Sequence, residues 1–232
     1  MSLKIFCDIA DYRIIKKFNK LKIVKGFTTN PSLMRASGAK NYKQYSLKIL
    51  KICKTKPISF EVFSDDIQGM IQQAHQIKSW GKNVYVKIPV VNSKGKFTGR
   101  AIKELSSNNV KLNITAVYTY DQVKKIVKVL NKRSKSIISI FAGRMADVGK
   151  DPVPIFKRSI NLTKKYKNIE ILWASTREVY NFLQAKDLGC QIITTPPKII
   201  EKINNFGKSY HNLTLDTVKG FLKDSRKSKF RI

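Results

Sequence analysis

Histidines and cysteines are scarce in this sequence, and each shortage excludes a kind of site. The two histidines, His75 and His211, leave almost no material for a histidine-based metal site or a Ser/His/Asp triad. The three cysteines, Cys7, Cys53 and Cys190, are odd in number and far apart, so they fit neither a disulfide framework nor a clustered metal site. We therefore expect a reducing, cytoplasmic location.

Long apolar runs and flexible linkers are also missing. No stretch reaches the roughly 18 consecutive apolar residues that a membrane-spanning helix needs. The opening "MSLKIFCDIADY" lacks the apolar core and the small-residue cleavage site of a secretory signal. No Gly/Ser-rich or Pro-rich segment divides the chain, and 42% hydrophobic content is enough for one sizeable core. We expect a single soluble domain over residues 1–232 with no membrane partner.

Basic residues, in contrast, outnumber acidic ones by 46 to 15 and give a formal net charge of +31. Such an excess raises nucleic acid or an anionic substrate as a partner. The lysines are spread over nearly every expected helix, and the one dense run is the basic tail "KDSRKSKFRI" from Lys223 to Ile232. Because this spread is typical of solvated helix faces, we expect no specific nucleic-acid partner.

Short β-branched or aromatic runs alternate with longer amphipathic stretches along the whole chain. The expected helices include 65–80 and 119–130, and a final helix is expected at 214–223. Eight strand–helix repeats predict an α/β fold, a (β/α)₈ or TIM barrel with an extra C-terminal helix, in preference to an open sheet. The expected strands are 4–8, 26–29, 58–63, 84–88, 110–114, 137–141, 170–174 and 191–194.

In such a barrel every second residue of a strand faces the interior, and the chemistry collects at the carboxyl ends of the strands. Most of the inward series end in a polar residue, so Lys87 belongs to a ring of inward polar side chains. The residues assigned inward are Phe6, Asp8, Ser59, Glu61, Tyr85, Lys87, Lys111, Asn113, Ile137, Ser139, Phe141, Ile171, Trp173 and Ser175.

Lys87 stands in the middle of "NVYVKIPVV", an otherwise apolar strand. Burial disfavours the charged form of an amine, and an uncharged amine attacks carbonyl carbons to form a Schiff base. Asp8 and Glu61 are carboxylates that can move protons, and Asn113 and Thr115 can orient substrate or water. The structural alternative is that Lys87 pairs with Glu61 as an interior ion pair, while Asp8 and Thr115 belong to turns.

Two segments that follow late strands indicate an anion site. "FAGRMADVG" places Arg144 after the sixth strand, and "WASTREV" places Ser175 and Arg177 after the seventh. The guanidinium fork matches a phosphate, and phosphate sites near the last strands are common in these barrels. Alternatively, either arginine forms a salt bridge at the rim.

Taken together, these motifs resemble the transaldolase family, in particular the short group that includes fructose-6-phosphate aldolases. The resemblance runs from residue 4 to about residue 222 in family order. The matching stretches are "IFCDIADYRIIKKF", "GFTTNPSLM", "SFEVFSDDIQGMIQQA", "YVKIPVV", "KLNITAVYTYDQ", "ISIFAGRMADVG", "ILWASTREV" and "TTPPKII".

The resemblance implies a role for each candidate residue. Lys87 is then the Schiff-base lysine, Asp8 is the acid–base group that acts on the sugar hydroxyl, and Glu61 with Thr115 handles the catalytic water. The implied contacts to sugar hydroxyls or to the lysine are Thr29, Asn30, Asn113 and Ser139. The implied phosphate clamp is Arg144, Ser175 and Arg177.

The implied reaction moves a dihydroxyacetone unit from a ketose phosphate, fructose 6-phosphate or sedoheptulose 7-phosphate, to an aldose phosphate such as erythrose 4-phosphate. This reaction belongs to carbohydrate metabolism and the pentose phosphate pathway, and the family uses no metal or organic cofactor. Members of the short group often form rings of five or ten subunits. The resemblance therefore implies sugar phosphates as small-molecule partners and a homo-oligomer, a pentamer or a decamer.

Phe141 and Glu61 bear on the choice within the family, since the aldolase branch typically has tyrosine and glutamine at these positions. A phenylalanine cannot protonate the bound three-carbon unit, which favours transfer. The alternatives are a fructose-6-phosphate aldolase-like lyase and an inactive basic barrel that binds anions or nucleic acid. Trp173, assigned inward, and the long basic loop 91–100 depart from the family pattern and leave the substrate open. Ile9, Ile140 and Ala142 also depart from it and are expected to alter packing alone.

Overall fold

In the computed structural model of the protein, which describes residues 2–203 and 205–228, eight parallel strands close into a barrel. Each strand pairs with its neighbours in sequence, and the last pairs with the first. The predicted (β/α)₈ barrel is therefore confirmed. The strands are β1 (Lys4–Asp8), β2 (Val24–Thr28), β3 (Ile58–Glu61), β4 (Val84–Pro89), β5 (Leu112–Val117), β6 (Ser136–Phe141), β7 (Ile169–Ala174) and β8 (Ile192–Thr195).

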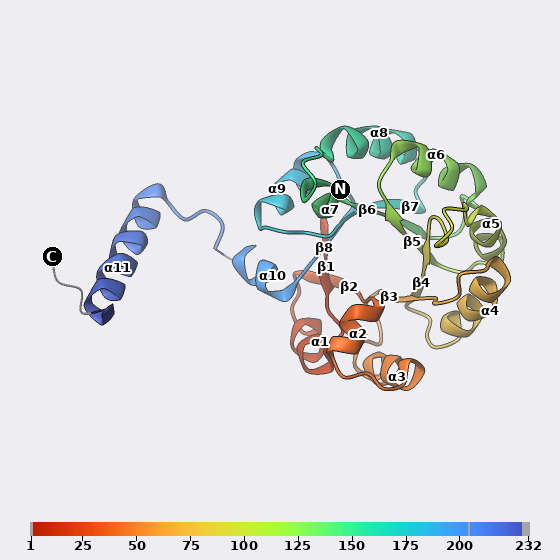
Figure 1. Ribbon diagram of the computed structural model, residues 1–232, viewed down its shortest axis with the longest axis horizontal. Coiled ribbons are helices and arrows are strands. Elements are labelled where there is room, and N and C mark those ends of the chain that lie inside the picture. Colours follow the sequence, from red (N-terminus) through yellow and green to blue (C-terminus); the bar gives the residue numbers. More distant parts are fainter. Residues whose placement is uncertain (1, 204, 229–232) are drawn as a thin grey trace.

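Helices surround the strands on all sides, as the view in Figure 1 shows. The expected helices at 65–80 and 119–130 are present as α4 (Ile67–Lys78) and α6 (Tyr120–Val129), where Asp66 and Thr119 cap the first turns. The helices are α1 (Tyr12–Asn19), α2 (Pro31–Ala36), α3 (Tyr42–Ile52), α4 (Ile67–Lys78), α5 (Gly99–Ser107), α6 (Tyr120–Val129), α7 (Ala142–Ala146), α8 (Val153–Thr163), α9 (Tyr180–Asp187), α10 (Pro197–Ile203) and α11 (Tyr210–Ser228).

The core has two parts because each strand buries both faces. The outward faces pack under the helices in one large apolar cluster, which includes Ile88 of β4 and Ile138 of β6. The interior holds a smaller cluster of Phe6, Tyr85, Ile137, Leu172, Ala174 and Ile192. Gly26 makes room for this cluster, since a Cβ there would lie 2.6 Å from the ring of Phe6. Apolar side chains fill the barrel interior, and the polar groups collect at its mouth.

The inward assignment of β7 was wrong. Leu172 and Ala174 face the interior, whereas Trp173 lies outside, stacked on Phe156 of α8 with ring centroids 4.6 Å apart. The physical reason is at Ser175, which follows the last residue of the strand and has a left-handed backbone with φ of 64°. Its side chain therefore does not continue the alternation of the strand. Trp173 contributes to the outer core and does not form the floor of a pocket.

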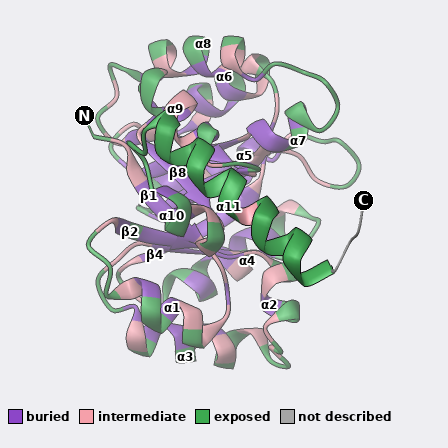
Figure 2. Ribbon diagram, turned by 90° about the vertical axis from the view of Figure 1, so that its left-hand side faces the viewer, coloured by how far each residue is buried: buried purple, intermediate pink, exposed green. Residues whose placement is uncertain are grey.

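The C-terminal helix α11 stands apart from the barrel beyond α10 (Figure 1). It is longer than the expected helix at 214–223, and none of its residues is buried; Figure 2 shows it exposed along its length. The predicted basic tail lies partly in α11, and its last residues, 229–232, lie outside the described residues. No helix in the described ranges is long and apolar enough to cross a membrane.

Candidate active site

A cavity of about 200 Å³ opens at the carboxyl ends of the strands. Because all strands are parallel, their final residues converge at this one end of the barrel. Ten of the twelve predicted site residues are on its wall, and the exceptions are Glu61 and Thr29. The lining residues are Asp8, Thr28, Asn30, Lys87, Asn113, Thr115, Ser139, Phe141, Arg144, Ala174, Ser175, Arg177 and Thr194.

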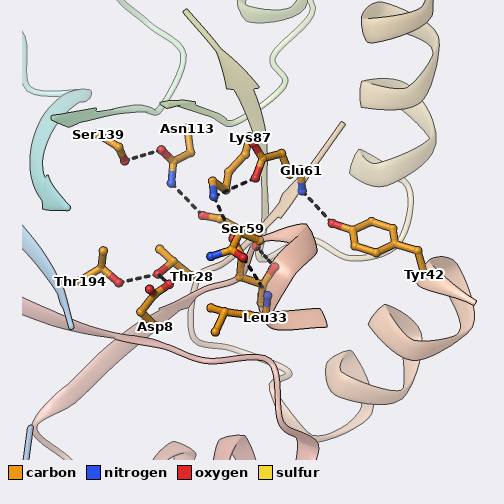
Figure 3. A network of polar contacts seen from close by, with 12 residues as sticks. Asp8, Thr28, Leu33, Tyr42, Ser59, Glu61, Lys87, Asn113, Ser139 and Thr194 are labelled. Carbon is orange, nitrogen blue, oxygen red and sulfur yellow. Dashed lines mark hydrogen bonds and ion pairs between the residues drawn. The ribbon is translucent and has the colours of Figure 1, made fainter. Parts of the chain in front are cut away.

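Lys87 reaches the cavity from near the end of β4 and is 7% exposed. Its Nζ lies 3.1 Å from Oε2 of Glu61 and donates a hydrogen bond of 2.9 Å to the carbonyl oxygen of Thr29. Figure 3 shows the amine beside the Glu61 carboxylate. The ion pair with Glu61, which the sequence left open as the structural alternative, thus exists, and the cavity beside it leaves room for a ligand at the same amine.

Glu61 contacts Lys87 but does not line the cavity. The residue ends β3, and its backbone N–H donates a hydrogen bond of 2.8 Å to the Tyr42 hydroxyl. The ring of Tyr42 packs edge-to-face with Phe60 and Trp80, and burial raises the pKa of its hydroxyl, so the group remains protonated. Tyr42 was not among the predicted site residues. It fixes the end of β3 and with it the carboxylate beside Lys87.

Asp8, at the end of β1, lies on the cavity wall within reach of the charge of Lys87. The Thr28 hydroxyl donates a hydrogen bond of 2.7 Å to Oδ1 of Asp8. Burial raises the pKa of the Asp8 carboxyl, although this hydrogen bond and the Lys87 charge act in the opposite direction. A raised pKa makes the carboxylate a stronger base, which suits proton exchange with a substrate hydroxyl.

Asn113 and Ser139 form a hydrogen-bonded chain with Ser59 across the interior. Ser139 donates to Oδ1 of Asn113 at 2.6 Å, and Nδ2 of Asn113 donates to the Ser59 hydroxyl at 3.1 Å. All three side chains are buried, and their mutual bonds reduce the cost of burying polar groups. This chain fixes which way the amide of Asn113 faces in the cavity wall.

Thr115 is 3% exposed, and its hydroxyl has no hydrogen-bond partner among the described residues. The next residue, Ala116, has φ of 59°, and the pairing of β5 with β6 shifts between Ile114 and Val117. This irregularity ends the regular strand directly after Thr115. A buried hydroxyl that lines a cavity and lacks a protein partner is suited to bind a water molecule or a substrate hydroxyl.

Thr29 and Asn30 differ in what they offer to the site. The Thr29 hydroxyl donates to the Ser59 carbonyl at 2.7 Å, so its side chain is engaged with the backbone and only its carbonyl meets Lys87. Asn30 lies on the cavity wall, and its Oδ1 accepts from the Leu33 N–H at 2.8 Å as the cap of α2. Its amide NH₂ is the group that a ligand can reach.

The three predicted phosphate-binding residues lie together on the opposite wall. Arg177 forms a salt bridge with Asp147, with Nε 3.0 Å from Oδ1. Arg144 forms no salt bridge within residues 2–203 and 205–228, and its guanidinium lies 5.9 Å from the Phe141 ring centroid. The rim salt bridge that the sequence left open therefore exists at Arg177, and Arg144 keeps its fork available for an anion.

Gly143 allows these arginines to lie side by side. A Cβ at this position would collide with the backbone oxygen of Ser175, so α7 approaches the end of β7 more closely than any other residue would permit. This close approach explains why the glycine of "AGR" precedes Arg144 directly.

Sequence reasoning missed Thr28, Thr194 and Ala174 on the cavity wall. Thr28 and Thr194 end the inward series of β2 and β8, and their hydroxyls hydrogen-bond to each other. The same alternation that placed Asp8 and Lys87 would have found both. Within the described residues, no three His, Cys, Asp or Glu side chains gather closely enough to hold a metal ion.

Comparison with known proteins shows the family to which the chain belongs. The chain matches the profile of one family, Transaldolase/Fructose-6-phosphate aldolase, over residues 5–232. A probable transaldolase of Nitrosopumilus maritimus is 34% identical over 229 residues, which cover 98% of this chain and 96% of that protein. A probable transaldolase of Thermoanaerobacter is 32% identical over 231 residues, which cover 99% of this chain and 100% of that protein.

A crystal structure of KGPDC from Streptococcus mutans superposes with a TM-score of 0.54, covering 84% of this chain and 87% of that chain. The two sequences are 9% identical, so this likeness concerns the fold alone. The family match and the curated relatives span nearly the whole chain, including the strand ends that form the cavity. The chain belongs to the transaldolase/fructose-6-phosphate aldolase family.

Proposed function

We propose that the protein is a transaldolase that holds a dihydroxyacetone unit on Lys87 as a Schiff base. The observation that carries this proposal is the buried Lys87 amine on the wall of a cavity that also holds the Asp8 carboxyl and the Arg144 guanidinium. A nucleophile, a proton carrier and an anion-binding group thus face one space. These are the groups that cleavage of a ketose phosphate needs.

Formation of the Schiff base requires Lys87 to lose a proton. The Glu61 carboxylate, 3.1 Å from Nζ, accepts this proton in our proposal, and the free amine attacks the C2 carbonyl carbon of the ketose. The resulting carbinolamine loses its oxygen as water, which takes up two protons and leaves the protonated imine. Protonated Glu61 returns its proton to the carbinolamine hydroxyl, which leaves as that water, and the unpartnered hydroxyl of Thr115 orients it.

Cleavage then uses Asp8. Its carboxylate takes the proton of the C4 hydroxyl, the C3–C4 bond breaks, and the electron pair moves to the imine nitrogen to give an enamine. The shorter aldose phosphate leaves. When a second aldose phosphate enters, the enamine carbon attacks its aldehyde carbon, and Asp8 returns the proton to the new hydroxyl.

Arg144 binds the phosphate in this proposal, and Arg177, oriented by Asp147, adds positive charge at the same wall. Fructose 6-phosphate or sedoheptulose 7-phosphate as donor and erythrose 4-phosphate as acceptor would place the protein in the pentose phosphate pathway. The proposal assigns the chemistry to side chains alone, without a metal or organic cofactor.

Replacement of Lys87 tests the proposal directly. Lys87→Ala should lower transfer from fructose 6-phosphate to erythrose 4-phosphate by about a thousandfold or more, because no other group forms the covalent adduct. The matched control is Lys111→Ala, which removes a half-buried lysine at the other end of the barrel, where burial lowers the pKa of its amine. A coupled assay measures both. Loss of activity in Lys111→Ala with activity retained in Lys87→Ala would overturn the assignment.

Phe141 separates transfer from simple aldol cleavage. Its ring lies on the cavity wall beside Arg144 and Tyr118 and offers no proton to the enamine. Phe141→Tyr should raise the release of free dihydroxyacetone without an acceptor by about tenfold or more, because a hydroxyl there can protonate the enamine carbon. If the unaltered protein already releases dihydroxyacetone as fast as it transfers it, the protein is an aldolase-like lyase.

The hydrogen bond from Thr28 should set the acid side of the pH profile. The rate falls where Asp8 becomes protonated, and the pKa of this carboxyl is already raised by burial. Thr28→Val removes a donor that stabilises the carboxylate, so the fall in kcat/KM should move to higher pH. Thr195→Val is the control, since that buried hydroxyl has no partner in the described part of the chain. An unmoved profile in Thr28→Val would remove Asp8 from its proposed role.

We further propose that copies of the chain form a homo-oligomer, a pentamer or a decamer, through α11. One side of this unburied helix carries a stripe of exposed apolar residues at helical spacing, and soluble proteins usually cover such a stripe. A second copy would supply that cover without any other component. The stripe consists of Tyr210, Leu213, Val218, Phe221 and Leu222.

Sedimentation velocity of the full chain tests this assembly. The unaltered protein should sediment well above its 26.6 kDa chain mass. Val218→Glu with Phe221→Glu should shift it toward the monomer, because charges at a buried interface are unfavourable. Lys219→Glu, on the polar side of the same helix, should leave the assembly intact. A monomeric unaltered protein would contradict the proposal.

A further inference from the structure

The end of the barrel opposite the cavity carries an unbalanced positive charge. Seven connections lead from a helix to the next strand, at 20–23, 53–57, 79–83, 108–111, 130–135, 164–168 and 188–191, and we call this end the amino-terminal face. These connections contain no aspartate or glutamate. Their basic residues are Lys20, Lys22, Lys54, Lys56, Lys82, Lys111, Lys132, Arg133, Lys135, Lys164, Lys165 and Lys167.

The catalytic end is different. The connections that follow the strands, with the short helices α2 and α7 included, hold seven basic and six acidic residues, so their charges nearly cancel. The excess of lysine is therefore not uniform over the molecule. The fold gathers twelve of the 46 basic residues on one end without a single compensating acid in the connections that form it.

Hydrogen bonds between neighbouring connections fix this face. Nδ2 of Asn83 donates to the carbonyl oxygens of Cys53 and Lys56, and Nδ2 of Asn168 donates to those of Lys132 and Arg133. Each asparagine thus braces one connection against the next. The positive charges stand on a fixed framework, and a ligand would not have to order these connections first.

A groove of about 540 Å³ lies in this face. Its walls include Lys20, Lys22, Lys56 and also Lys25 of β2, and no acidic residue contributes to them. Burial lowers the pKa of Lys56, and the charge of Lys25 acts in the same direction. The Lys56 ammonium donates hydrogen bonds to the carbonyl oxygens of Asn19 and Leu21, and an anion in the groove would offset the charge that Lys25 adds beside it.

We propose that the amino-terminal face binds the phosphodiester backbone of nucleic acid, without preference for base sequence. Eleven of its twelve basic residues are lysines, which attract phosphates as point charges and rarely read base edges. Nucleic acid, with phosphates at regular short spacing, matches a charge that is spread over six connections.

An anionic membrane fits this face less well. Leu21, 37% exposed, is the one large apolar side chain exposed in these connections, all of which the structure describes. Stable attachment to a bilayer usually needs an apolar or lipid anchor in addition to basic residues. The amino-terminal face offers charge, a groove and a single exposed large apolar side chain, which favours a soluble polyanion.

Salt-dependent binding of the full chain to a labelled mixed-sequence DNA duplex tests the proposal. Fluorescence anisotropy should show a dissociation constant that rises steeply with salt. A plot of the logarithm of the association constant against the logarithm of the salt concentration should have a slope of about −0.9 for each phosphate engaged. Single-stranded RNA of mixed sequence should bind with a similar dependence. Changing the base sequence at fixed length should alter the affinity by less than about threefold.

Two variants of equal charge locate the binding. The first variant removes four exposed charges from the amino-terminal face and should reduce the magnitude of the salt slope by about 3 to 4. It consists of Lys22→Gln, Lys54→Gln, Lys135→Gln and Lys167→Gln. The control removes the same number of exposed lysines from helix faces and should change the slope by less than about 1. It consists of Lys16→Gln, Lys103→Gln, Lys125→Gln and Lys157→Gln.

The possible outcomes are distinct. Equal losses in both variants would show diffuse attraction and overturn the proposal, as would the absence of binding at low salt. Binding to phosphatidylserine vesicles without binding to either nucleic acid would assign the face to membranes instead. Because none of the substituted lysines lines the catalytic cavity, transaldolase activity should persist in both variants and shows that they are folded.

Discussion

A buried ammonium group between one carboxylate and one backbone carbonyl is the interaction around which the mouth of this barrel is arranged. The Lys87 ammonium forms an ion pair with Glu61 on one side and donates a hydrogen bond to the carbonyl oxygen of Thr29 on the other. Both acceptors are fixed by further contacts. Tyr42 holds the backbone of Glu61, and the Thr29 hydroxyl is bound to β3. A charge that would be costly in an apolar interior is thereby accommodated, and the amine still faces a cavity.

The closed parallel sheet explains why the two ends of the molecule differ so strongly. Parallel strands send all their carboxyl ends to one side, where Asp8, Lys87, Asn113 and Arg144 meet although they are far apart in the sequence. The connections that enter the strands gather at the opposite side and carry lysines without acids. One topological rule thus separates the end that holds the cavity, where charge is nearly balanced, from a strongly basic end.

Much of the site could be predicted because strand alternation and strand ends are properties of the sequence. Asp8, Lys87, Asn113 and Ser139 follow from counting by two along regular strands. Counting by two failed where the backbone leaves the extended conformation. Ser175 has a left-handed backbone, and the alternation counted from it as an inward residue wrongly placed Trp173 of β7 inside the barrel. It could not reveal Tyr42, whose hydroxyl reaches Glu61 from a helix. The charge asymmetry was hidden too, because lysines from six separate connections become neighbours only in the fold.

The central claim is that Lys87, and no other lysine, bonds covalently to the substrate, and reductive trapping tests it most directly. Fructose 6-phosphate and borohydride should convert the imine to a stable secondary amine, and peptide mass mapping should place the added mass on Lys87. The account predicts one modified site, in the peptide that contains "VYVKIPVV". Added mass on Lys111 or Lys56, or no added mass while transfer proceeds, would contradict it.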